Sequence, residues 1–512
     1  MTRLFSSAAI LPLIIATPAL ADVTADDLWS YYQDSYAQFG VNLTVNQARD
    51  GNVVTWSDIS AEIVLPMDFG EITLRTGPFT LTENSDGSLN IDVPGAGAIN
   101  FFGIFGPDDD VTVTGQILTT SSGLVTVVTG APDDMTLTST YDEITFEIAD
   151  LDLTSDVEDL PFVFELSGNQ RNGNSVTRIV NADLTNIEMT YKLEEMNYTF
   201  HMSGPDGLDQ TQTGQTRDTQ SRSLISIPDM PLDYMNIASA IRAGLAIQMD
   251  ATSASSTTLV SGRDVSGMVM NQDQRMGATQ QSLSFGADGL SFDGAFADIT
   301  AKIGMPEFMP MDIDLAIPQG SYAFDIPIQA DIAAQDFRYM VSITDITVNE
   351  DIWRLVDPSE LIARDPIDFT IDLGADVILK QDLLDFNGVM ALANQADDPL
   401  AFFDIETVKL DALNLSAAGA ALVANGAFTL DMTDMVTMGG FPRPEGRAEA
   451  EITGYNQLVD TLIEMGVLAA EDAMAARMGL AMFTQATGDD AVATELEVNA
   501  EGHVIVNGQR IR

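Results

Sequence analysis

Apolar and polar residues alternate with a period of two through most of the chain. The alternation begins at Val41 and is interrupted by turn signals such as Asp50-Gly51 and Asp86-Gly87. This pattern is typical of β-strands with one buried and one wet face, and tight turns join such strands into antiparallel hairpins. The sequence therefore predicts a mainly β protein with minor α, built as elongated, largely antiparallel twisted β-sheet with a few amphipathic helices packed on it.

Helical spacing of apolar residues is confined to short segments. Thr24 and Asp27 form a capping-box pair in front of an aromatic stripe. We interpret Met474, Met478 and Met482, which recur at helical spacing, as core filler. Further helices are expected over residues 228–249, 455–466 and 469–486, and a helix or loop over 353–362. A strand pair is expected over 368–379, and a closing hairpin over 493–512 that turns at Glu501-Gly502.

Two segments depart from the strand pattern. Residues 94–107 are glycine-rich, apolar and uncharged, with Phe101, Phe102 and Phe105 among them. This segment is interpreted either as a buried loop or as an apolar lip that contacts a hydrophobic ligand. Residues 204–222 are polar, and they predict either a long exposed hairpin or a boundary between domains.

The opening residues have the features of a secretory signal peptide. Arg3 precedes the apolar run Leu4 to Leu20, and Ala19-Leu20-Ala21 provides a small-x-small cleavage site. We expect the mature chain to begin at Asp22 and to reside in the periplasm, with no membrane segment after cleavage. The expected parts are a signal peptide (1–21), a helix plus β-rich half (22–230), a second such half (231–445) and a helical pair with a closing hairpin (446–512).

An internal duplication is suggested by one short match. Residues 58–66 (DISAEIVLP) resemble residues 298–306 (DITAKIGMP), and residues 182–193 are a looser third copy. Repeated strands of this kind fit a sheet built by stacking similar units. Chance similarity between amphipathic strands is the alternative explanation.

The charge is strongly acidic, with 22 basic and 77 acidic residues and a net charge of −55. Such a chain repels nucleic acids and anionic membrane surfaces, which bind Lys and Arg clusters. An adaptation to a saline habitat explains the same charge without a partner. Because 45% of the residues are hydrophobic, the chain is expected to fold around a large core or to line an apolar groove. It has no cysteine, and hence no disulfide.

Candidate chemistry is sparse. His201 and His503 are the two histidines, far apart in sequence, so neither a zinc site nor a Ser–His triad is expected. Residues 168–175 have the glycine spacing of a phosphate loop, but Asn174 replaces the required Lys. Asp108–Asp110 and Asp150–Asp159 are interpreted as calcium-binding or, preferably, as solvated acidic loops. We therefore assign no catalytic residue, no metal ligand and no cofactor, and the ligand-binding residues stay unassigned.

The C-terminal half contains the motif W-x-x-x-D-P followed by a second D-P (353–366), the strand 368–373, and the segments 415–431, 444–454 and 501–510. In these segments the chain resembles a secreted bacterial family known as domain of unknown function 2125. The resemblance implies an envelope β-protein and, by distant analogy, a lipid-binding groove; it implies no site residues.

These observations favour a non-catalytic envelope protein that binds a hydrophobic or lipid ligand in a β-groove. The alternatives are a structural or protein-interaction module of the envelope and a carboxylate-dependent glycan hydrolase, which needs two carboxylates in one cleft. The expected partners are a lipid or another envelope protein. The oligomeric state is left open.

Overall fold

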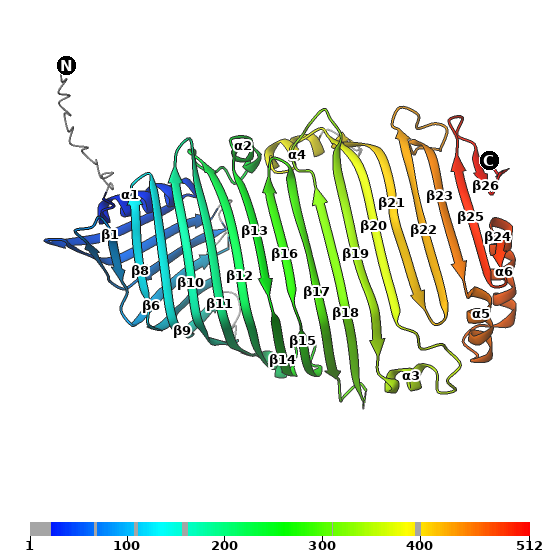
Figure 1. Cartoon of the computed structure of the whole chain (residues 1–512), viewed down its shortest axis with the longest axis horizontal. Helices are drawn as coiled ribbons and strands as arrows, with labels where there is room; N and C mark the ends of the chain where they lie inside the picture. Colours follow the sequence, from blue (N-terminus) through cyan, green and yellow to red (C-terminus); the bar gives the residue numbers. More distant parts are fainter. Residues whose placement is uncertain (1–21, 66–68, 107–110, 156–161, 310, 395–400) are drawn as a thin grey trace, which may run out of the picture.

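A computed structural model describes residues 22–65, 69–106, 111–155, 162–309, 311–394 and 401–512. The expected signal peptide, the Asp108–Asp110 cluster and residues 156–159 of the second acidic cluster lie outside these ranges. The described strands form one 27-stranded sheet in which every strand pairing is antiparallel (Figure 1). The predicted fold class, mainly β with minor α, is confirmed.

The helices are short and few compared with the strands. They are α1 (Ala25–Gln38), α2 (Ile237–Arg242), α3 (Glu350–Val356), α4 (Phe386–Ala393), α5 (Tyr455–Glu464) and α6 (Ala470–Phe483). Strands β1 to β14 are β1 (Val41–Asp50), β2 (Val53–Leu65), β3 (Gly70–Thr76), β4 (Phe79–Glu83), β5 (Leu89–Asp92), β6 (Ala96–Phe105), β7 (Val111–Ser122), β8 (Val125–Ala131), β9 (Asp134–Ser155), β10 (Val163–Asn181), β11 (Leu184–Ser203), β12 (Asp209–Pro228), β13 (Ala246–Ser253) and β14 (Ser255–Arg263). The remaining strands are β15 (Val269–Met276), β16 (Thr279–Gly286), β17 (Gly289–Gly304), β18 (Asp312–Ile326), β19 (Gln335–Val348), β20 (Ile367–Leu379), β21 (Phe403–Ala417), β22 (Ala420–Asp431), β23 (Arg443–Thr453), β24 (Gln485–Gly488), β25 (Ala491–Val498), β26 (Val504–Val506) and β27 (Gln509–Arg510).

The topology is a simple meander. Most strands pair with the strands before and after them in sequence, and tight turns such as Asp50-Gly51-Asn52 connect them, as predicted. At some places in the sheet, two short strands that follow each other in sequence pair with the same long strand. For example, β12 pairs with β13 over one half of its length and with β14 over the other half. The expected domain boundaries at residues 230 and 445 stay predictions. The hydrogen-bonded sheet continues through both positions, from β12 to β13 and from β22 to β23.

A line of bulges and breaks, here called the crease, crosses the sheet. Arg171, Glu195 and Arg217 are paired in one row across β10, β11 and β12, and Gly173, Leu193 and Thr219 are paired in the next row. Each strand has one residue between these two rows, and these residues lie in one line across the sheet. Members of the crease with left-handed backbone are Asp58, Asn172, Asp218, Asp298 and Asp345, whose φ values lie between 49° and 59°. Asp and Asn tolerate this conformation better than most residues, and an extra residue in a strand bends it.

The two segments that suggested a duplication both begin on the crease. Asp58 and Asp298 occupy equivalent bulges, each followed by the second half of a long strand. Asp345-Ile346-Thr347 repeats the start of the motif at a third bulge. The short match is therefore accounted for by a shared local structure, the bulge and the amphipathic strand that follows it.

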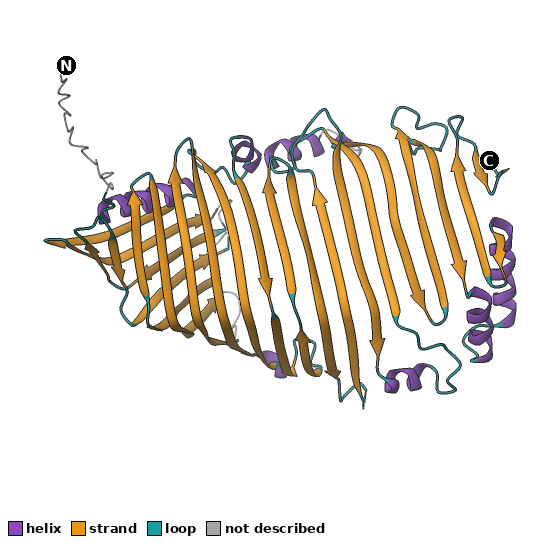
Figure 2. Cartoon of the chain, viewed as in Figure 1, coloured by secondary structure: helices purple, strands orange, loops and turns teal. Residues whose placement is uncertain are grey.

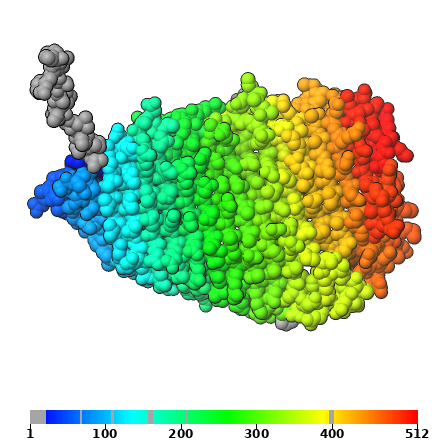
Figure 3. Space-filling view, viewed as in Figure 1, coloured from blue at the N-terminus to red at the C-terminus, as the bar shows by residue number. Residues whose placement is uncertain are grey.

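The main hydrophobic core lies at the N-terminal end. Thr24 and Asp27 form the predicted capping box of α1, which buries Leu28 against Trp56, Leu81 and neighbouring strands. Figure 1 shows the first strands, in blue, steeply inclined to the later green strands, so the sheet curls round this core. The space-filling view tapers to this end and broadens toward the C-terminus (Figure 3).

Helices and loops line one rim of the sheet. The end of α1 is joined to the segment before α2 by a backbone hydrogen bond of 2.7 Å from Leu232 to Gln38. Next to it, Ala238 donates to the carbonyl of Leu384, and Arg242 forms an ion pair with Asp382. A second small core, centred on Ile241 and Leu245 beside α2, lies under this rim. Figure 2 shows the helices at the rims and ends, with a broad field of strands between them.

Three local predictions were wrong, and a fourth is decided between its two alternatives. Residues 94–107 include strand β6, which is paired on both sides with β3 and β7, instead of forming a loop. Of the two alternatives for residues 204–222, the long hairpin is confirmed: residues 204–208 form the turn between β11 and β12, and residues 209–222 belong to β12, which is paired with β11. In 228–249 the helix α2 spans six residues, since β13 starts at Ala246. The segment 368–379, expected to be a strand pair, is the single strand β20.

Candidate functional site

One face of the sheet, here called the apolar face, carries a continuous cross-strand row of mostly apolar side chains. Directly paired residues of an antiparallel sheet lie on the same face. The row, in order from β5 to β26, is Leu89, Val128, Leu137, Thr177, Met189, Ser223, Met249, Leu283, Phe292, Phe324, Tyr339, Leu373, Leu410, Gly426, Ala448, Leu496 and Val506.

The apolar face is buried at its N-terminal end and open in its middle. Leu89 and Val128 are fully buried in the core beneath α1, whereas Met249, Phe292 and Tyr339 are 39–41% exposed. No second layer of described strands covers these three side chains. The chain accordingly exposes 29288 Å², against about 18,000 Å² for a compact protein of this mass.

Aromatic rings on this face lie over glycines of neighbouring strands. Tyr141 is paired with Gly173, Tyr198 with Gly214, and Tyr322 with Gly294. A Cβ atom at Gly173 would fall 2.0 Å from the ring of Tyr141, so the glycine leaves the space that the ring occupies. The pairing lays rings along the sheet instead of raising them from it, which keeps the surface smooth.

A small hydrogen-bonded cluster lies where the crease crosses the apolar face. The hydroxyls of Tyr141 and Tyr191 both donate to Oε1 of Gln170, at 2.8 and 3.0 Å, and lie 2.8 Å from each other. Burial, and then the neighbouring Tyr191, raise the pKa of Tyr141. The phenol of Tyr141 therefore stays neutral at physiological pH and introduces no charge into the apolar face.

The opposite face, here called the polar face, carries charged residues. Ion pairs such as Arg178–Asp134 and Arg338–Asp372 join neighbouring strands on it, at 2.7 and 2.8 Å. Exposed pairs of this kind contribute little to stability individually. Their effect here is to make one face of the same sheet highly soluble while the other face stays apolar.

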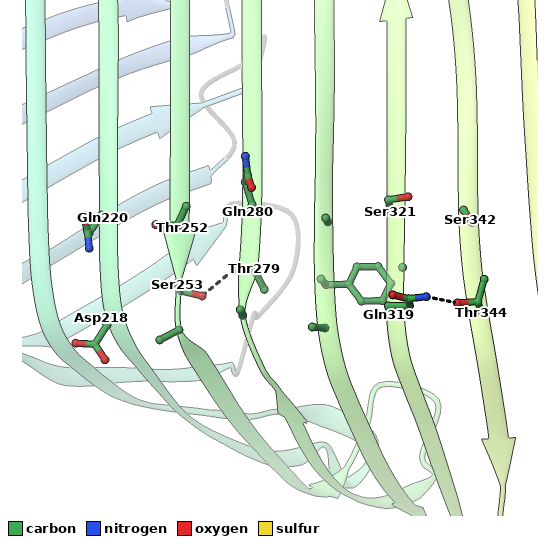
Figure 4. Close-up of a pocket in the computed structure, with 16 residues that line it drawn as sticks. Asp218, Gln220, Thr252, Ser253, Thr279, Gln280, Gln319, Ser321, Ser342 and Thr344 are labelled. Atoms are coloured by element: carbon green, nitrogen blue, oxygen red, sulfur yellow. Dashed lines mark hydrogen bonds between the residues drawn. The ribbon is translucent and has the colours of Figure 1, made fainter.

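A trough of 780 Å³ follows the crease across the middle of the polar face. One side of it is a paired row from β12 to β19 that consists of Gln220, Thr252, Gln280, Ala295, Ser321 and Ser342. Asp218, Gln319 and Thr344 lie along the other side, and Figure 4 shows the two sides as two levels of side chains. Asp218 is the single charged residue in this lining.

The two histidines lie on different parts of the sheet. His201 is on β11, where its Nε2 is 3.0 Å from Asp209 and its Nδ1 is 3.4 Å from Glu165. His503 is in the closing hairpin beside Asn499. The structure does not bring them together, and within the part of the chain that it describes neither side chain is hydrogen-bonded to a serine.

His201 gives a pH prediction. The hydrogen bond to Asp209, followed by the charge of Glu165, raises the pKa of His201 above 6.5, although partial burial opposes this. A raised pKa in the folded state stabilises the protein below the unfolded pKa, and this stabilisation disappears as the pH rises through the folded pKa. Replacing His201 with Gln should lower the urea midpoint at pH 5.5 and leave it unchanged at pH 9. Equal losses at both pH values would contradict this.

The other candidate motifs are structural where they are described. Residues 168–175 lie within the long strand β10, so they form no phosphate loop. Among the described residues, no group of three or more His, Asp or Glu has the arrangement of a metal site. Asp357, from the W-x-x-x-D-P motif, is fully buried and accepts a hydrogen bond from the amide of Ile362 at 2.7 Å. Burial opposes its charged form, but backbone amides outweigh this and lower its pKa.

The methionines of α6 are not core filler. Met474, Met478 and Met482 are 64–76% exposed, while Ala473 on the other side of the helix is buried. Arg477 fixes the helix by donating to Asp460 and to the carbonyl of Asn456. The helix is confirmed, but its side with Ala473, Arg477 and Leu480, not the methionine stripe, faces the protein.

Comparison with protein-family models gives no match to this chain, and comparison with curated proteins gives none. The resemblance in the C-terminal half therefore stays a prediction. No helix among the described residues is long and apolar enough to cross a membrane.

Proposed function

We propose that this protein is a non-catalytic, periplasmic envelope protein that binds the acyl chain of a lipid on its apolar face. The observation that carries the proposal is the row of exposed Met, Phe and Tyr side chains in the middle of the sheet. Large exposed apolar patches on soluble proteins mark sites of interaction. Water leaves such a surface when an acyl chain covers it, which is favourable by roughly 25 cal/mol for each Å² buried.

The shape of the face suits a long, flexible ligand. Neighbouring strands are about 4.8 Å apart, so the part between β9 and β25 extends for roughly 60 Å. Rings that lie over glycines offer a smooth surface without deep subsites. Such a surface selects for apolar character and not for a particular molecular shape, and it accommodates acyl chains of different length.

The N-terminal core gives the proposed groove a closed end. Leu89 and Val128, which continue the row of the apolar face, are already covered by α1 and the first strands. A ligand can therefore lie only on the part of the face beyond this core. The ligand charge is restricted as well, because a net charge of −55 disfavours lipids with strongly anionic headgroups.

The test is native mass spectrometry of the mature chain, purified from the envelope of its own organism without detergent. We expect a mass excess that organic extraction removes, with fatty acids identified in the extract. A chain that carries no extra mass and yields no fatty acid would overturn the proposal. Protein expressed in the cytoplasm of a heterologous host and never exposed to the envelope is the control for lipid acquired during lysis.

Docking of a partner protein is the second candidate function, and helix α6 favours it. Its exposed methionines form an adaptable apolar stripe, flanked by the exposed carboxylates of Glu471 and Asp472. A glycan hydrolase finds less support, because the lining of the central trough includes one carboxylate, Asp218, where two are required.

A further inference from the structure

We infer that the trough on the polar face is a second binding site, specific for a short neutral oligosaccharide. It is independent of the apolar face, because successive residues of a strand point to opposite sides of the sheet. On β13, for example, Met249 belongs to the apolar face while Thr252 lines the trough. The volume of 780 Å³ lies within the range of small-ligand sites.

The crease creates the trough. Small residues lie at its lowest level, where Ala254 and Ala278 occupy the breaks between β13 and β14 and between β15 and β16. Asp298 bends β17 at the same level through its left-handed backbone. The bend and the missing side-chain bulk together hollow a surface that would be flat on a regular sheet.

The polar groups of the trough suit a ligand with many hydroxyl groups. The amides of Gln220 and Gln280 and the hydroxyl of Thr252 make no side-chain hydrogen bond in the described structure, whereas Gln319 donates to Thr344 at 3.0 Å. Each free amide can donate and accept at once, which matches a sugar hydroxyl. Gln220 and Gln280 are two strands apart, so they span about 10 Å, enough to contact successive sugar rings.

The charges select a neutral ligand. The lining contains neither Lys nor Arg, so nothing in it neutralises a phosphate, sulfate or uronate group. Asp218, at one side, repels anions and can accept from a hydroxyl. A long apolar ligand is disfavoured too, because it would cover the free amides without replacing their hydrogen bonds to water.

Isothermal titration calorimetry with the full mature chain tests this inference. The probes are maltotriose, cellotriose and the trimer of N-acetylglucosamine, with trigalacturonate as the charged comparison. We expect at least one neutral trisaccharide to bind with a Kd of about 1 mM or tighter, and trigalacturonate to bind at least tenfold more weakly. The absence of binding by all three neutral trisaccharides, or equal binding of trigalacturonate, would overturn the inference.

Variants place the binding in the trough. The double change Gln220→Ala with Gln280→Ala should weaken binding at least fivefold, and Ala295→Trp should block the trough. Gln248→Ala is the matched control. Gln248 is exposed on the polar face of the same strand β13, four residues before Thr252, and it does not line the trough. Binding that survives the double change, or that falls equally in the control, would contradict the assignment. Circular dichroism of each variant verifies that the sheet is intact.

Discussion

Replacing Leu81 with Ala should destabilise the protein by about 2–5 kcal/mol, the largest effect expected for a single conservative truncation. Leu81 is fully buried in the N-terminal core, with contacts from α1, Trp56 and the strands around it. Its truncation leaves a cavity that the surrounding strands cannot close, because they are held by hydrogen bonds on both sides. Stability in this molecule is concentrated where the sheet curls round a core.

The fluorescence of the core provides the measurement. Trp29 and Trp56 lie in or against this core with ring centroids 5.3 Å apart, so urea unfolding of this region changes their emission. The matched control is Leu415→Ala, a leucine that is 43% exposed on the open part of the apolar face, for which a loss of about 1 kcal/mol or less is expected. Equal losses for the two variants would show that the open sheet is as tightly packed as the curled end.

Much of the secondary structure could be predicted from local patterns. The period-two alternation located most strands, because each strand has one wet and one apolar face. The capping box at Thr24 and the turns at Gly51 and Gly87 were recognisable, since their residue types are imposed by the backbone. Strand β6 was missed because its glycines, at positions 97 and 103, hide the alternation of Ile99 and Phe101.

The crease has a sequence signal of its own, a change in the spacing of apolar residues. Residues of the apolar face are normally two apart, but they are three apart across each bulge, as in Trp56 to Ile59 and Phe296 to Ile299. An Asp lies between the members of each pair. A shift of phase at an Asp or Asn therefore indicates a bulge, and a shift at corresponding places in successive strands indicates a crease.

The candidate site could not be predicted, because alternation does not tell whether a second layer covers the apolar side of a strand. The sequence around Phe292 resembles that of a packed sandwich strand, yet its side chain is open to solvent. The same limit applies to α6, where helical spacing is compatible with a buried or an exposed methionine face. Both depend on long-range placement, which local patterns do not encode.

Replacing Leu415 with Asp should remove bound lipid from the protein, whereas Val423→Asp should not. Leu415 lies on the apolar face, paired with Phe369 and Leu422, while Val423 on the neighbouring strand is paired with Asn414 and Glu451 on the polar face. Their exposures are similar, 43% and 49%, so the two changes place the same charge at comparable depth on opposite sides of the sheet. An unpaired carboxylate beside an acyl chain loses its hydration, and binding must supply that cost.

Lipid content per protein, measured by native mass spectrometry and by fatty-acid analysis of the extract, distinguishes the two variants. We expect a loss of at least tenfold for Leu415→Asp and less than twofold for Val423→Asp, with both variants retaining the circular dichroism of the sheet. Equal retention in both would exclude this part of the apolar face as the binding surface. Equal loss in both would show that the added charge itself, and not its position, releases the ligand, which would separate lipid binding from the apolar face altogether.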